Sequence, residues 1–124
     1  MRVLITGSRT WRWRGQVYAE LIQLEKLARA QGERLVIVVG DCPSGVDKFT
    51  AEWAKVNWNV LAEVHYANWE KHGKGAGFIR NSAMVDSGAD RAIAFIHNHS
   101  HGATDCADKA DKAGIPTMRL EHND

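Results

Sequence analysis

Short runs of branched apolar residues alternate along this chain with longer segments of mixed polarity. The length of these runs and their content of Val, Ile and Leu are typical of buried β-strands. The pattern predicts strands at residues 3–6, 35–39, 60–65, 92–96 and 115–120.

The segments between the strands have the spacing of apolar residues that is typical of helices. The first is the clearest, because its apolar side chains recur every three or four residues and Gly32 follows as a stop signal. The residues of this apolar face are Val17, Leu21, Leu24 and Ala28.

A second helix is expected to begin near Ser44. The Ser44 hydroxyl would cap the first N–H groups, and Asp47 would reach back to complete a capping box. Phe49, Trp53 and Val56 would then form the buried stripe of this helix.

Two further helices are expected at about residues 76–87 and 103–113. Ile79 and Ala83 share one face of the former, and Gly88 follows it. The latter offers only small residues to its neighbours, which favours close packing on a sheet. These residues are Ala103, Ala107 and Ala110, with Gly114 after them.

Strands that alternate with helices imply right-handed βαβ crossovers and a parallel sheet covered on both faces. The predicted class is α/β, a three-layer Rossmann-like domain with a mostly parallel five-stranded sheet and about four helices. Residues 3–6, 35–39 and 92–96 are the most continuously apolar and should be central. Pro116 has no N–H to donate, which places the last strand at an edge. The chain of 124 residues is expected to be one domain, residues 1–124.

Composition and charge exclude several classes of protein. The 16 Lys and Arg residues nearly balance 15 Asp and Glu, and 44% of residues are hydrophobic, so neither disorder nor a strongly basic DNA-binding surface fits. No apolar run is long enough to span a bilayer, and we expect a cytoplasmic protein. Cys42 and Cys106 are too few for a disulfide scaffold and are expected to be reduced thiols. No cofactor is predicted.

The loops that follow the strands are rich in residues suited to binding anions. Gly7 and Ser8 follow the first strand, and Gly40, Ser44 and Gly45 follow the second. The carboxyl ends of parallel strands meet at one edge, where glycine lets backbone N–H groups approach an anion and helix N-termini add a favourable dipole. We therefore expect phosphate at this edge. Any single loop of this kind is equally consistent with an ordinary βα turn.

Two common phosphate-binding motifs are not matched. Residues 40–47 have the glycine spacing of a P-loop, but Val46 and Asp47 stand where that motif needs Lys and then Ser or Thr. Gly-x-Gly-x-x-Gly is missing after the first strand. Walker-type ATP hydrolysis and ordinary NAD chemistry are therefore disfavoured.

Several charged and polar side chains could complete such a site. Arg9 could hold a phosphate in a bidentate way through two of its guanidinium N–H groups, or it could be an exposed surface residue. Arg80, followed by Asn81, lies near a helix N-terminus, where it opposes the dipole unless an acidic ligand or partner compensates. Asp47 is either the capping-box acid, which the pattern favours, or a ligand of a ribose hydroxyl.

Aromatic and histidine residues in the loops allow other interpretations. An extended loop would place His97, His99 and His101 on one side, where they could bind zinc, although a solvated loop is the simpler interpretation. Residues 11–14 interleave tryptophan with arginine, a pattern that suits single-stranded nucleic acid. Trp69 or Trp11 could instead stack on one base.

A set of motifs occurs in order over nearly the whole chain, the most specific being the Gly-Lys-x-Ala-Gly-x-x-Arg-Asn-x-x-Met block at residues 73–84. The others are Gly7-Ser8-Arg9, Gly40-x-x-x-Ser44-Gly45-x-Asp47, the helix that contains Ala54, Ala67-x-Trp69, Ala94-Phe95 and Gly102-Ala103-Thr104. Together these motifs resemble the YspA-like branch of the SLOG superfamily.

The resemblance implies a Rossmann-like fold with a nucleotide or nucleotide-derived ligand at the carboxyl edge. The superfamily includes LOG phosphoribohydrolases, which release the base from nucleoside 5'-monophosphates, and DprA proteins, which bind single-stranded DNA. Arg80 looks like the arginine of the hydrolases, with Asn81 in place of their lysine. The turn at Gly102, Ala103 and Thr104 looks like their phosphate-binding turn.

This chain also departs from the hydrolases in two places. Residues 97–101 stand where the hydrolases have a proline and two glycines before the turn. Cys106 stands where they place a glutamate, and the nearby Asp105 and Asp108 are out of register. Splitting a glycosidic bond needs a carboxylate close to the ribose. Hydrolysis is thus left open, with Arg80 and either Asp47 or Asp105 as the residues that would carry it.

The leading hypothesis is a nucleotide-binding domain without a metal, which the resemblance expects to be a homo-oligomer, a dimer. Phosphate would be held by Gly7, Ser8, Gly102 and Thr104, with charge from Arg9 and Arg80. The alternative is a single-stranded nucleic-acid-binding module related to DprA.

Overall fold

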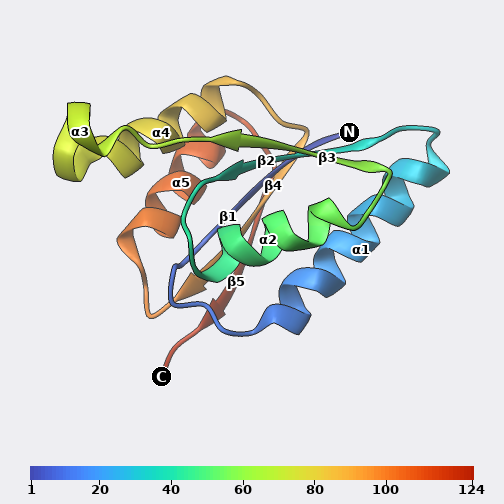
Figure 1. The fold of residues 1–124 in the computed structure, drawn as a ribbon, viewed down its shortest axis with the longest axis horizontal. Coiled ribbons are helices and arrows are strands. Elements are labelled where there is room, and N and C mark those ends of the chain that lie inside the picture. The colour runs from blue at the N-terminus through green and yellow to red at the C-terminus, as the bar shows by residue number, and fades with distance from the viewer.

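The computed structural model describes residues 1–124 and places a five-stranded parallel sheet between two layers of helices (Figure 1). The strand order is β3-β2-β1-β4-β5, and every neighbouring pair is parallel. The strands are β1 (Arg2–Gly7), β2 (Leu35–Gly40), β3 (Val60–His65), β4 (Arg91–His97) and β5 (Thr117–His122). The predicted α/β class, the three central strands and the edge position of the last strand are confirmed.

The strand order reverses at β1. The chain adds β2 and then β3 on one side of β1, and afterwards returns to place β4 on its other side. Crossovers on opposite sides of β1 leave a crevice between the loops that follow β1 and β4. Ligands of open α/β sheets bind at such a point.

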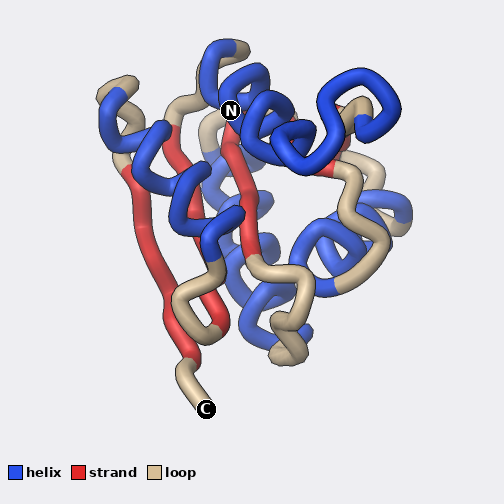
Figure 2. Tube along the Cα trace, turned by 90° about the vertical axis from the view of Figure 1, so that its left-hand side faces the viewer, coloured by secondary structure: helices blue, strands red, loops and turns tan.

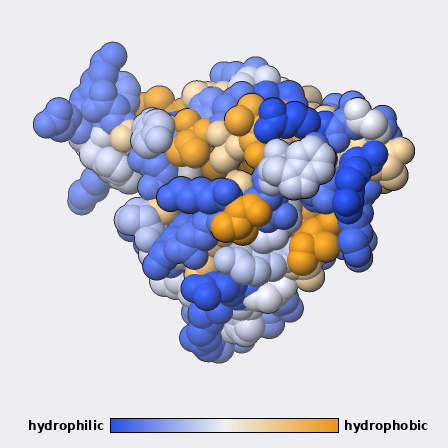
Figure 3. All heavy atoms as spheres, turned by 45° about the vertical axis from the view of Figure 1, so that its right-hand side comes forward, coloured by the Kyte–Doolittle hydropathy of each residue, from blue (hydrophilic) through white to orange (hydrophobic).

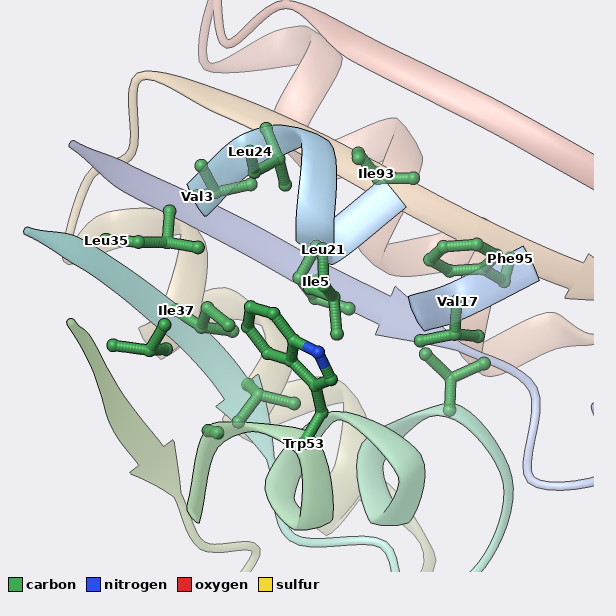
Figure 4. Packing of buried hydrophobic residues seen from close by; sticks show 14 of the residues in the cluster. Val3, Ile5, Val17, Leu21, Leu24, Leu35, Ile37, Trp53, Ile93 and Phe95 are labelled. Atoms are coloured by element: carbon green, nitrogen blue, oxygen red, sulfur yellow. The ribbon is translucent and has the colours of Figure 1, made fainter. Parts of the chain in front are cut away.

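The helices cover both faces of this sheet. They are α1 (Arg14–Ala30), α2 (Gly45–Lys55), the short α3 (Trp69–His72) and 3-10 turn η1 (Gly73–Gly75), α4 (Ala76–Asp86) and α5 (His101–Lys112). The larger core lies beneath α1 and α2, where Leu21 and Trp53 pack on Ile5 and Ile37 (Figure 4). A smaller core joins α4 and α5 to the opposite face through Leu4, Val38, Met84 and Cys106. Figure 2 shows the helices on either side of the strands.

The predicted apolar faces of α1 and α5 are confirmed. Val17, Leu21, Leu24 and Ala28 are buried on α1, as are Ala103, Ala107 and Ala110 on α5.

The predicted faces of α2 and α4 are partly wrong. Val56 is 80% exposed, and α2 instead buries Val46, Thr50 and Trp53. On α4, Ile79 and Ala83 face solvent while Asn81 and Met84 are buried. Asn81 is buried because its amide finds acceptors on α5, a partner that helical periodicity does not reveal.

The capping box at the start of α2 is also wrong. Ser44 is the N-cap residue, but its hydroxyl makes no capping bond and donates to the Arg9 carbonyl at 3.1 Å. The Asp47 carboxylate accepts from the Cys42 N–H at 3.1 Å instead of from Ser44. Both side chains are thereby directed toward the loops at the sheet edge.

No helix of the protein is both long enough and apolar enough to cross a membrane. Figure 3 shows one face of the molecule, on which hydrophilic residues dominate and hydrophobic ones form small separate groups.

Candidate functional site at the carboxyl edge of the sheet

The loops after β1, β2 and β4 enclose a cavity of about 360 Å³ at the point where the strand order reverses. It is lined by residues from β1, α2, α4 and α5. Those that the sequence singles out are Gly7, Ser8, Arg9, Asp47, Arg80, Asn81, Gly102 and Ala103. The crevice thus brings together most of the predicted residues, which come from four separate segments.

A second hollow of about 260 Å³ adjoins this cavity. Arg9, Cys42 and Arg80 line both, and the second adds Asp41 and Trp69. Trp69 is 52% exposed, so part of its ring is accessible. The two adjoining hollows together therefore combine polar and charged side chains with the aromatic ring of Trp69.

The N-terminus of α5 opens into the cavity with unbonded backbone N–H groups. The first N–H that bonds back along the helix is that of Thr104, to the Ser100 carbonyl at 3.1 Å. The amides of His101, Gly102 and Ala103 have no acceptor in the protein, and all three residues line the cavity. Ser100 does not cap them, because its hydroxyl lies 2.6 Å from that of Ser8. Unbonded amides at a helix N-terminus are suited to an anion.

Ser8 ties the loop after β1 to the end of β4. Its side-chain oxygen accepts from the His97 N–H at 2.8 Å and pairs with Ser100, and Ser8 is only 3% exposed. The preceding Gly7 has no room for a side chain, because a Cβ there would lie 2.6 Å from the Cβ of Val46. These two residues therefore set the shape of the cavity wall.

Ser44 and Gly45 support the same loop from behind and do not line the cavity. Gly45 has a φ of +69°, and a Cβ there would overlap the Ser8 carbonyl. Only glycine fits this position without strain. The tight contact presses the N-terminus of α2 against the backbone of Ser8 and Arg9.

Arg80 is held by an acidic partner that sequence reasoning missed. Its Nη1 donates to Asp41 Oδ1 at 2.7 Å, and its Nε donates to Asn81 Oδ1 at 3.3 Å. Asp41 compensates the unfavourable position of Arg80 near the N-terminus of α4. The available signal was that Asp41 directly follows β2 at the edge where the other site residues gather.

Asp47 is a buried carboxylate beside this pair. It is 6% exposed, and burial raises its pKa to about 6, although the Cys42 N–H and the nearby Arg80 oppose the shift. Gly40 makes this cluster compact, since a Cβ there would lie 2.7 Å from Asp47 Oδ2 and 2.8 Å from Arg80 Nη1. Oδ2 accepts from Cys42, whereas Oδ1 has no hydrogen-bond partner in the protein. Asp47 can therefore accept a hydrogen bond from a ligand.

The raised pKa of Asp47 predicts a pH-dependent effect of Asp47→Asn on stability. The folded chain holds the proton up to about pH 6, while the unfolded chain releases it near 3.8, so ionisation disfavours the folded state. As pH rises from 4 to 7, the unfolding free energy of the wild type should fall by roughly 2–3 kcal/mol relative to that of the variant. Urea denaturation of both proteins across this range measures it; a constant difference would contradict the assignment.

Thr104 and Asp105 lie outside the cavity. They line another hollow, of about 510 Å³, to which α4, β4 and β5 also contribute residues. The Asp105 carboxylate pairs with Lys109 Nζ at 2.9 Å and accepts from Asn81 Nδ2 at 3.3 Å. Asn81 Nδ2 also donates to the Gly102 carbonyl at 3.1 Å, which ties α4 to the first turn of α5. Asp47 is thus the carboxylate in the cavity, with Asp41 in the adjoining hollow.

The three histidines do not share one side of an extended loop. Asn98 and His99 have φ values of 51° and 54°, so the chain turns sharply between β4 and α5. His97 is buried, with Nδ1 2.8 Å from the Thr10 hydroxyl and Nε2 2.7 Å from Asp124 Oδ1. The extended conformation on which the zinc hypothesis depended is therefore wrong.

The tryptophans of residues 11–14 make contacts within the protein. Trp11 is 2% exposed, and Trp13 stacks on His122 with ring centroids 3.8 Å apart. The Arg12 guanidinium lies over the Trp13 ring and pairs with Asp124, and that of Arg14 lies over Phe49. Trp11 is therefore not the stacking face that the sequence suggested, whereas Trp69 lies beside the cavity.

Two comparisons bear on identity. The sequence model of the YspA, cpYpsA-related SLOG family matches residues 1–72. The gene 61 protein of Mycobacterium phage D29 is 43% identical over 123 residues, which cover 96% of this chain and 95% of that protein. No solved structure gives a significant match. The chain belongs to the YspA, cpYpsA-related SLOG family.

Proposed function

We propose that this protein binds a nucleotide or nucleotide-derived ligand, with its phosphate at the N-terminus of α5. The observation that carries the proposal is the group of three unbonded amides, at His101, Gly102 and Ala103, in one cavity with Arg9. The Arg9 guanidinium has no hydrogen-bond or ion-pair partner in the protein. An anion would satisfy the amides and the cation together. Membership of the SLOG family supports a nucleotide-related ligand.

The other groups of the site suit the remaining parts of a nucleotide. The unpartnered Oδ1 of Asp47 would accept a hydrogen bond from a ribose hydroxyl. Trp69 in the adjoining hollow would offer its ring to the base. Arg80, oriented by Asp41, would add positive charge between them.

Cleavage of the N-glycosidic bond would rest on Asp47. The transition state resembles an oxocarbenium ion and needs a carboxylate near the ribose. Asp47 lines the cavity, whereas Asp105 is paired with Lys109 and lines a different hollow. Release of free base from nucleoside 5'-monophosphates, followed by chromatography, tests this step; loss of the activity in Asp47→Asn would assign it.

The binding proposal predicts a specific loss in Arg9→Ala. Binding of ribonucleoside 5'-monophosphates should weaken about tenfold or more, because one charged hydrogen bond to phosphate contributes roughly 1.5–3 kcal/mol. Binding of the corresponding nucleosides should change little. Isothermal titration calorimetry with both ligand series measures the difference.

Arg14→Ala is the matched control, since Arg14 lies over Phe49 and does not line the cavity. It removes the same charge and should leave the affinity for monophosphates unchanged. Equal affinity of the wild type for nucleosides and their monophosphates, or equal losses in both variants, would overturn the proposal.

The geometry does not favour the nucleic-acid alternative. That hypothesis depended on exposed aromatic faces at residues 11–14, and Trp11 is buried while Trp13 is stacked on His122. A site for one nucleotide should also respond weakly to salt, in contrast to a surface that contacts many phosphates.

A further inference from the structure

The outer edge of β5 is an unpaired strand edge. The strand lies at one end of the sheet, and Figure 2 shows it along the outside, leading to the C-terminus. The carbonyl of Pro116 accepts from the Ala92 N–H at 2.8 Å, and that of His122 from the Asn98 N–H at 2.9 Å. Since alternate residues of a strand direct their backbone groups to the same side, the even-numbered residues face β4. The N–H and C=O groups of Thr117, Arg119 and Glu121 therefore face outward.

We propose that this edge pairs antiparallel with β5 of a second copy of the chain, about a two-fold axis at Leu120. The two sheets would join into one continuous sheet. A two-fold contact is self-complementary: if one residue of the first copy faces a second residue of the other copy, the same two residues also face each other with the copies exchanged. In this register Arg119 lies directly opposite Glu121 of the second copy, and the pair occurs twice.

Charge selects this register over its neighbours. An axis at residue 119 would place Arg119 opposite itself, and an axis at residue 121 would do the same with Glu121. Like charges directly opposite one another destabilise a strand pair, whereas opposite charges stabilise it. The outward-facing backbone groups of Arg119 and Glu121 also form the hydrogen-bonded pairs that an antiparallel ladder requires.

Arg119 and Glu121 are both available for the new contact. Nη2 of Arg119 binds Asp108 and Asp111 of its own chain, which leaves its Nη1 and Nε without a partner. Glu121 is exposed and has no hydrogen-bond or ion-pair partner in the protein. The free carboxylate of Glu121 and the free N–H groups of Arg119, two residues apart on the strand, are therefore available to form the two ion pairs across the two-fold axis.

The opposite face of the joined strands would bring together the side chains of Met118, Leu120 and His122. Leu120 would meet Leu120 of the second copy, and Met118 would meet His122. Met118 is 42% exposed in the single chain, and with Thr117 it lines a hollow of about 670 Å³ beside α1. In the dimer, the end of the partner's β5 would cover the part of this hollow that is formed by β5.

Charge-reversal variants test the pairing. Sedimentation equilibrium over a range of protein concentrations should show a dimer for the wild type. In Arg119→Glu the facing residues become two acids, and in Glu121→Arg two cations, so each variant should raise the dimer dissociation constant at least tenfold. An equimolar mixture of the two variants should form a heterodimer, because every facing pair is then of opposite charge.

Lys26→Glu makes the same charge change as Arg119→Glu, but on the exposed side of α1, and should leave the dimer intact. Circular dichroism checks that all variants are folded. A wild type that stays monomeric, a dimer that neither variant weakens, or a mixture of weakened variants that fails to associate would each overturn the proposal. The test does not involve the strand-end cavity, so its outcome is independent of the proposed ligand.

Discussion

Replacing Arg80 with alanine is expected to weaken binding of ribonucleoside 5'-monophosphates about 100-fold or more. The side chain is 14% exposed and donates to Asp41 at 2.7 Å beside the cavity. Its removal takes away a cation that would attract the phosphate and leaves Asp41 without its ion-pair partner. The unpaired Asp41 carboxylate would then repel an incoming anion, and a 100-fold loss corresponds to about 2.7 kcal/mol.

Arg80→Lys separates charge from geometry. Lysine retains the positive charge but offers no planar fork to bridge Asp41 and Asn81, so its affinity should lie between wild type and alanine. Calorimetric titration measures the affinities, and urea denaturation at the titration pH checks that each variant is folded. An alanine variant that is folded and binds as tightly as wild type would remove Arg80 from the site.

Gly7→Ala is expected to destabilise the fold by about 3 kcal/mol. The added Cβ would lie 2.6 Å from the Cβ of Val46 and 2.9 Å from the Phe95 carbonyl oxygen. Both neighbours are buried and belong to α2 and β4, so neither can move without disturbing the core. Overpacking of this kind costs about 1–3 kcal/mol, and a clash with backbone adds to it. Urea denaturation measures the change.

Gly15→Ala is the matched control, because a Cβ at Gly15 in α1 meets no atom within 4 Å. This variant should be neutral or stabilised by up to about 1 kcal/mol, as alanine favours a helix. Val46→Ala combined with Gly7→Ala should recover part of the loss, since it removes the Cγ2 methyl group of Val46, the atom that the added Cβ would overlap most closely. If Gly7→Ala and Gly15→Ala had similar unfolding free energies, the residues around Gly7 would be able to move aside for the added Cβ, and the prediction would be wrong.

The strands, the four longer helices and the buried faces of α1 and α5 could be predicted from the sequence for a physical reason. A buried parallel strand must be apolar on both faces, and an amphipathic helix must repeat its apolar residues every three to four positions. Residues 35–39 and the face of α1 satisfy these demands locally. Glycine and polar residues after the strands then marked the edge where the cavity lies.

The buried faces of α2 and α4, and the hydrogen-bond partners of the polar residues, could not be predicted in the same way. Asn81 is buried and Ile79 is exposed because α4 packs against Gly102 and Asp105 of α5, which are distant in sequence. Asp47 had the spacing of a helix cap, yet the loop after β2 brings the Cys42 N–H to it. Local pattern cannot distinguish a capping carboxylate from one buried in a cavity.

The sequence by itself determined the alternation of strands and helices, the parallel sheet and the family, because these follow from local periodicity and from motifs in order along the chain. Only the tertiary structure decided that Asp41 holds Arg80, that Asp47 enters the cavity while Asp105 does not, and that Trp11 is buried. These outcomes depend on which segments meet in space, and the burial and pairing of a charged or polar side chain are determined by those neighbours.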